Sequence, residues 1–173
     1  MSKTTLGTIW LDACSGCHMS FLDLDEHLIE LAEKVQVVYS PLVDHKEIPE
    51  QVDLFLISGA VSTDEDHEKV QTIRRASDLV VSLGDCAVTG NVPSMRNSFS
   101  VEETLSEAYG EDGVKPWEEP VPQLTEPVKP VHAVIEVDGY IQGCPPGREL
   151  ISFYLRELLE GRLPGRGIRT KFG

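Results

Sequence analysis

Short apolar segments alternate along the chain with segments in which apolar residues recur every three or four positions. The continuous apolar runs 52–57 (VDLFLI) and 78–83 (DLVVSL) are typical of strands that are buried on both faces. Residues 4–11, 35–39 and 131–137 predict three further strands, because they are short and rich in β-branched residues. The pattern therefore predicts about five strands.

Helical periodicity fills most of the intervals between these strands. The predicted helices run from just after Cys17 to Val35, from Ser62 or Thr63 to Arg75, from Val101 to Tyr109, and from Pro146 to Gly161. Strands that alternate with helices form a parallel sheet with helices on both faces, so we expect a doubly wound α/β fold. A flavodoxin-like parallel sheet of about five strands is its simplest form.

One stretch, residues 90–130, departs from this alternation. It is rich in proline and glutamate around the predicted helix at 101–109. Two interpretations stay open, namely a disordered linker or an ordered insertion that covers the sheet edge or contacts a partner. We expect one domain over residues 1–161, which includes this insertion, and a basic C-terminal tail at 162–173.

Charge narrows the classes of function. The formal charge is −14, which argues against binding to nucleic acid or to an anionic membrane. The last 13 residues nevertheless carry four basic residues and no acidic one, and we hypothesise that this tail docks on an acidic neighbour. No apolar run approaches the roughly 18 residues of a membrane span. Because the first residues lack the pattern of an export signal, we expect a cytoplasmic protein.

Four cysteines, Cys14, Cys17, Cys86 and Cys144, are the clearest candidates for chemistry. A disulfide framework suits small secreted chains, whereas a C-x-x-C pair in a reducing compartment points to metal or redox chemistry. All four cysteines follow predicted strands of a parallel sheet, and the carboxyl ends of such strands lie at one edge. Convergence at that edge favours one shared site over a lone redox pair or four unrelated buried cysteines.

The surrounding residues bear on what the thiolates hold. Zinc and an iron–sulfur cluster both accept four thiolates, so the ligand set alone does not separate them. Glycines beside the cysteines and predicted helix starts after Cys17 and Cys144 favour a bulky anionic cluster modestly. This fold can also bind FMN, but nothing in the sequence resembles a phosphate-binding loop or a G-x-G-x-x-G fingerprint. FMN on this chain is therefore not expected.

Three motifs resemble those of one known family. Residues 14–26 (CSGCHMSFLDLDE) and 84–97 (GDCAVTGNVPSMRN) are similar to the first and second cluster loops of [NiFe]-hydrogenase small subunits, and residues 143–146 (GCPP) are similar to the third. The closest resemblance is to the cytoplasmic NAD-reducing, bidirectional enzyme. Membrane-bound uptake relatives often place Glu where this chain has Ala13. A related NADH dehydrogenase subunit has adjacent cysteines in the first loop, unlike this chain.

The resemblance implies that Cys14, Cys17, Cys86 and Cys144 hold one [4Fe-4S] cluster, the one proximal to a nickel–iron centre on a large subunit. It implies no catalytic residue on this chain. The chain would relay single electrons between that centre and a diaphorase module, which contains flavin and iron–sulfur clusters and reduces NAD⁺. The alternatives are a hydrogenase small subunit that serves another acceptor and a structural zinc module with four cysteine ligands.

Four polar residues lie close to the cysteines in sequence. His18 could move protons or contact a partner, but a polar residue at a helix start is the simpler interpretation. Asp12 and Asp85 could tune the cluster, although turn or cap roles are favoured. For Arg148, two roles are equally supported: a cation close to the cluster, or a solvated surface side chain.

Overall fold

Five parallel strands form the central sheet of the protein, which the computed structural model describes over residues 3–110 and 121–165. These strands are β1 (Thr4–Trp10), β2 (Val35–Tyr39), β3 (Val52–Ser58), β5 (Ser77–Leu83) and β7 (Gly139–Ile141). Their spatial order is β2-β1-β3-β5-β7. Numbered within the sheet, this is the 2-1-3-4-5 order of flavodoxin-like folds, so the predicted fold class is confirmed.

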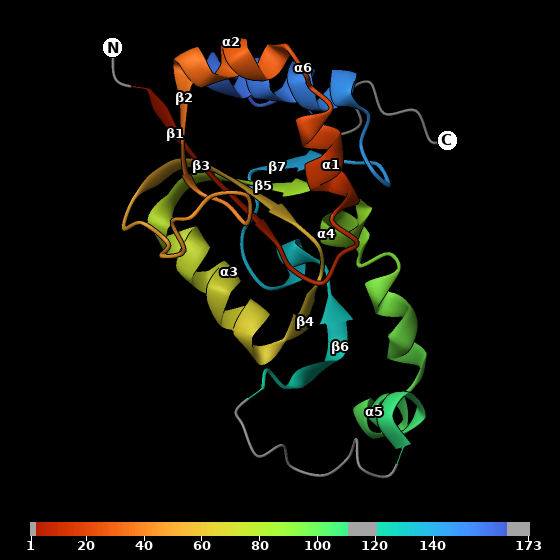
Figure 1. Cartoon of the computed structure of the whole chain (residues 1–173). Helices are drawn as coiled ribbons and strands as arrows, with labels where there is room; N and C mark the ends of the chain where they lie inside the picture. Colours follow the sequence, from red (N-terminus) through yellow and green to blue (C-terminus); the bar gives the residue numbers. More distant parts are fainter. Residues whose placement is uncertain (1–2, 111–120, 166–173) are drawn as a thin grey trace.

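Helices cover both faces of the sheet (Figure 1). On one face lie α1 (Gly16–Leu22), α2 (His27–Lys34) and α6 (Arg148–Leu159), which share a core with Val81 and Leu83 of β5. On the other face, α3 (Asp64–Ala76) and α4 (Asp85–Thr89) share a second core with Val80 of the same strand. Alternate residues of β5 therefore face opposite cores, as a strand buried on both sides requires.

The helix predicted after Cys17 is divided into α1 and α2. Asp25, in the acidic segment between them, adopts a left-handed conformation with φ 51°, which no continuous α-helix accommodates. Leu24 is only 4% exposed, so the apolar period continues across the break. The apolar periodicity therefore continues although the helix is interrupted, and the prediction of one continuous helix is wrong.

The strand predicted at 131–137 is also wrong. Val131–Ala133 forms a short 3-10 helix, η3, and the fifth strand is β7, two residues beyond the predicted segment. Val131 and Ile135 are buried, which explains why the segment has the apolar content of a strand. They enter the core from an irregular segment, whereas the hydrogen-bonded position beside β5 is taken by Gly139–Ile141.

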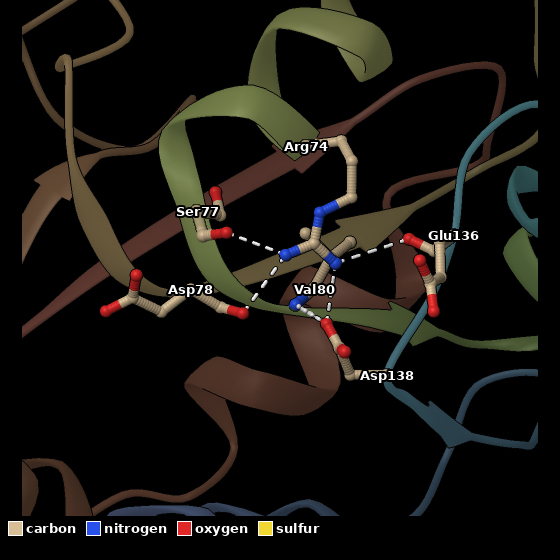
Figure 2. A network of polar contacts seen from close by, with 6 residues as sticks. All are labelled: Arg74, Ser77, Asp78, Val80, Glu136 and Asp138. Carbon is tan, nitrogen blue, oxygen red and sulfur yellow. Dashed lines mark hydrogen bonds and ion pairs between the residues drawn. The ribbon is translucent and has the colours of Figure 1, made fainter.

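Arg74, near the end of α3, fixes the segment that leads into β7 (Figure 2). Its guanidinium donates to the carboxylate of Asp138 at 2.6 Å and to the backbone carbonyl oxygens of Ser77, Asp78 and Glu136 at 2.6, 3.0 and 3.3 Å. The Asp138 carboxylate also accepts the backbone N–H of Val80 at 2.8 Å. The planar guanidinium of Arg74 thus joins α3, β5 and the segment before β7. A lysine could not reproduce this geometry, because its ammonium group lacks the planar array of donors.

The insertion is ordered over the residues that the structure describes. It contains η1 (Pro93–Ser98), α5 (Val101–Tyr109) and β6 (Leu124–Lys129), which pairs with β4 (Val61–Thr63) in a two-stranded antiparallel sheet. The predicted helix at 101–109 is confirmed. Arg96 donates to the carbonyl oxygens of Ser62 and Thr125 at 2.9 and 3.0 Å, which ties η1 to both strands. Residues 111–120 lie outside the described part.

The described start of the predicted basic tail contacts its own chain. Arg162 pairs with Glu157 and Glu160 at the end of α6, at 2.7 and 2.5 Å. The other three basic residues of the tail lie beyond residue 165, outside the described residues. Among the helices of the described residues, none has the length and apolar content needed to cross a membrane.

Candidate functional site

The four cysteines come from three loops at the carboxyl edge of the sheet. Cys14 follows β1 and Cys17 lies in the first turn of α1, while Cys86 lies in the first turn of α4, directly after β5. Cys144 follows β7 rather than the strand that we predicted. All four are free thiols, and Cys14 and Cys144 are exposed. The predicted convergence on one sheet edge therefore holds, although one of the strands behind it was misplaced.

The four cysteines are close enough to affect one another electrostatically. Burial, together with the charges of Cys86, Cys14 and Cys144, raises the pKa of the Cys17 thiol to about 12. Thiolates repel one another, so four of them together need a cationic group to remain deprotonated. The arrangement is therefore suited to a metal-containing group and poorly suited to four free thiolates.

Gly84 forms the wall behind Cys17. A Cβ atom at this position would lie 2.2 Å from the Cys17 Sγ, far inside van der Waals contact. The backbone angles, φ 84° and ψ 161°, belong to a region that is essentially restricted to glycine. Gly16 stands similarly beside Cys14, where a Cβ would lie 3.2 Å from the sulfur. Missing side chains thus make room for the sulfurs themselves.

Backbone and carboxylate hydrogen bonds join the second and third cysteine loops. The N–H of Gly84 donates to the carbonyl oxygen of Ile141 at 2.7 Å, and the N–H of Asp85 donates to that of Gly143 at 2.9 Å. In return, the Asp85 carboxylate accepts the N–H of Gly143 at 2.8 Å. Asp85 therefore stabilises the turn, as the sequence predicts, and it fixes Cys86 relative to Cys144.

The first loop is tied down separately. The Ser20 hydroxyl of α1 donates to the carbonyl oxygen of Pro146, beyond Cys144. Asp12 forms an antiparallel backbone bridge with Ala60 rather than the turn or cap that we expected. Arg148 pairs with Asp25 at 3.2 Å and with Glu149 at 3.4 Å, and its side chain is 56% exposed. These contacts fit a solvated arginine that links α6 to the α1–α2 connection.

His18 is buried beneath the first loop, which the sequence did not indicate. It is 2% exposed, its Nδ1 lies 3.2 Å from the Ser58 hydroxyl, and its Nε2 lies 3.1 Å from the Thr8 hydroxyl. Burial lowers the pKa of His18 to about 4, so the imidazole is neutral near pH 7. His18 thus anchors α1 to β1 and β3. Its edge-on contact with the Trp10 ring, 5.0 Å between centroids, adds to this packing.

Asn91 is a site residue that sequence reasoning missed. Its side-chain Nδ2 donates to the Cys144 Sγ at 3.4 Å. Burial raises the pKa of Cys86, whereas hydrogen bonds from the Asn91 side chain and the Val92 backbone lower it. Asn91 belongs to the second motif, but its position two residues before a proline does not indicate a contact with sulfur.

Several apolar side chains are exposed on the elements that follow Cys17 and Cys86 in the chain. Met19 of α1 is 56% exposed, and Val92, Met95 and Phe99 around η1 are each more than 60% exposed. An apolar surface of this kind beside a functional edge is typical of a protein–protein contact.

The residues present fit an iron–sulfur cluster. Four thiols converge, glycines leave space behind two of them, and the Asn91 side chain donates an N–H to a third. Within residues 3–110 and 121–165, no group of three or more His, Cys, Asp or Glu side chains could hold a metal ion as it stands. A four-iron cluster spaces its ligands more widely than a single ion, so convergence without such a group is compatible with a cluster.

Comparison with known proteins gives consistent matches over nearly the whole chain. Residues 14–158 match the model of the family described as NADH ubiquinone oxidoreductase, 20 Kd subunit. The delta subunit of the NAD-reducing hydrogenase HoxS of Cupriavidus necator is 40% identical over 168 residues, which cover 92% of this chain and 80% of that protein. A subunit of the F420-non-reducing hydrogenase of Methanococcus voltae is 41% identical over 94% of this chain, but the chain spans only 58% of its length.

One chain of a solved structure is similar to this protein over nearly the full length of both chains. In the crystal structure of an NAD⁺-reducing [NiFe]-hydrogenase in the H₂-reduced state, one chain matches with a TM-score of 0.91 and 36% identity. The match covers 99% of this chain and 100% of that chain.

Proposed function

Because the chain belongs to the NADH ubiquinone oxidoreductase 20 kDa subunit family and, within it, to the hydrogenase subunits, we propose that it is the electron-relay subunit of a cytoplasmic [NiFe]-hydrogenase that reduces NAD⁺. The observation that carries this proposal is the convergence of four thiols from three strand ends at one edge of the sheet, where Gly84 packs against Cys17. Electron transfer requires a bound redox group, and the residues here provide its ligands.

Cys14, Cys17, Cys86 and Cys144 would hold one [4Fe-4S] cluster. When bound, the cluster accepts and donates single electrons at a potential set by hydrogen bonds, charge and burial. The chain contributes the supporting structure: the Asp85–Gly143 pair holds two loops together, and the neutral His18 fixes the first. A buried, hydrogen-bonded frame keeps the ligands in place during repeated turnover.

The hydrogen-activating site would lie on a large subunit, so this chain has no catalytic residue of its own. The exposed apolar side chains of Met19 in α1 and of Val92, Met95 and Phe99 around η1 are candidates for contact with that partner. Diaphorase subunits with flavin and iron–sulfur clusters would then pass the electrons to NAD⁺.

A second candidate function differs only in the acceptor. The Methanococcus relative belongs to an F420-non-reducing hydrogenase and matches this chain at 41% identity. The 80% coverage of the Cupriavidus relative, against 58% for the Methanococcus relative, favours the NAD-reducing assignment.

Metal analysis of the anaerobically purified chain tests the ligand assignment. The proposal predicts about four iron atoms and about four acid-labile sulfides per chain, as in a [4Fe-4S] cluster. Stoichiometric zinc without sulfide would instead identify a structural zinc module and overturn the proposal. Because both groups use thiolate ligands, the elements must be counted in the same sample.

A further inference from the structure

Asn91 lies where the second cysteine loop turns into η1. It has φ 35°, a left-handed conformation that asparagine tolerates better than most residues. Its carbonyl oxygen accepts hydrogen bonds from the Ser94 hydroxyl at 2.7 Å and from the Ser94 N–H at 3.2 Å. The turn is therefore closed by local hydrogen bonds, which fix the backbone from which the side-chain amide extends.

The Asn91 amide reaches across to a cysteine of another loop. Its Nδ2 donates to the Cys144 Sγ at 3.4 Å, across 53 positions of sequence. The same side chain also lowers the pKa of the Cys86 thiol, which belongs to the loop of Asn91 itself. A carboxamide nitrogen carries two N–H donors, so a second donor remains when one is directed at Cys144.

We propose that Asn91 is a positioning residue that donates a hydrogen bond to the sulfur of Cys144 and thereby raises the reduction potential of the cluster. This inference rests on the proposed function, because it requires a cluster on these cysteines. Adding an electron increases the negative charge on the ligand sulfurs. A fixed N–H donor consequently stabilises the reduced state more than the oxidised state.

Two substitutions separate the donor from the shape of the turn. Asn91→Gly removes the amide while keeping a residue that accepts positive φ. Asn91→Asp keeps the shape and the backbone preference but replaces the donor with a negatively charged acceptor. The matched control is Thr89→Ala, because Thr89 is exposed on α4 and its hydroxyl donates to the Asp85 carbonyl oxygen rather than to sulfur.

The measurement is the midpoint potential of the cluster in the purified complex, from a titration followed by electron paramagnetic resonance. Asn91→Gly should favour the oxidised state by about tenfold, which equals a shift of about −59 mV for one electron. Asn91→Asp should shift the potential further in the same direction, and Thr89→Ala should leave it unchanged. A purely structural role would not produce this order.

Each other outcome has a defined meaning. Potentials of both Asn91 variants equal to that of the wild type, with full iron content, would overturn the tuning role. Loss of the cluster from both variants would assign Asn91 to cluster retention and would also overturn it. Absence of iron from the wild-type complex would instead contradict the proposed function itself, so the two failures can be distinguished.

Discussion

The Gly84→Ala variant is expected to lose its cluster. The added Cβ would lie 2.2 Å from the Cys17 Sγ, so either the sulfur or the backbone must move. Neither can move easily, because the N–H of Gly84 is bonded to Ile141 at 2.7 Å and Cys17 packs against the core. We expect iron to fall from about four atoms per chain to nearly none, measured by elemental analysis of the anaerobically purified chain.

Gly110→Ala is the matched control for this variant. Gly110 has φ 68° and ψ −160°, in the same glycine-restricted region as Gly84, and a Cβ there would meet nothing within 4 Å. Both substitutions therefore carry a backbone cost of about 1–3 kcal/mol, but only one collides with a ligand sulfur. Full iron content in Gly84→Ala, or equal loss in both variants, would contradict the role assigned to the Gly84 wall.

The Cys86→Ser variant should lose electron transfer while the partner modules keep their own activities. Hydrogen-dependent NAD⁺ reduction by the complex should fall by more than the ~10–100-fold that outer-shell changes cause, because a direct ligand is lost. NADH oxidation with an artificial acceptor should stay at the wild-type level, since that reaction would not pass through this chain. The two rates are measured on the same preparation.

The exposed Thr89, three residues further along α4, supplies the control for Cys86→Ser. Thr89→Ala should leave both rates unchanged, because the Thr89 hydroxyl donates to the carbonyl oxygen of Asp85 and not to a cysteine. Equal loss of hydrogen-dependent reduction and NADH oxidation in Cys86→Ser would show that the complex is disrupted, which contradicts a relay role confined to this chain.

Local sequence patterns predicted the parts of this molecule that depend on local interactions. The runs 52–57 and 78–83 are strands because their residues are apolar on both faces, and Thr63 caps α3 as its hydroxyl accepts the N–H of Asp66 at 3.1 Å. The cysteines could be grouped without coordinates, because parallel strands deliver the loops that follow them to one edge.

Features that depend on distant contacts could not be predicted in this way. The position of the last strand is set by Arg74, which holds Asp138 from 64 positions away. The burial of His18 depends on hydroxyls of β1 and β3, and the role of Asn91 depends on a sulfur in another loop. At Asp25 a single residue adopts a left-handed conformation and interrupts the helix. The apolar periodicity does not indicate such a change, because it continues across the break.

Exposure of the purified complex to hydrogen tests the central claim most directly. Electron paramagnetic resonance should detect reduction of a cluster on this chain when hydrogen is added to the complex, and no reduction when hydrogen is added to this chain alone. In a complex that carries Cys86→Ser, the same signal should be absent. A cluster that stays oxidised under hydrogen in an active wild-type complex would contradict the claim that this chain relays electrons.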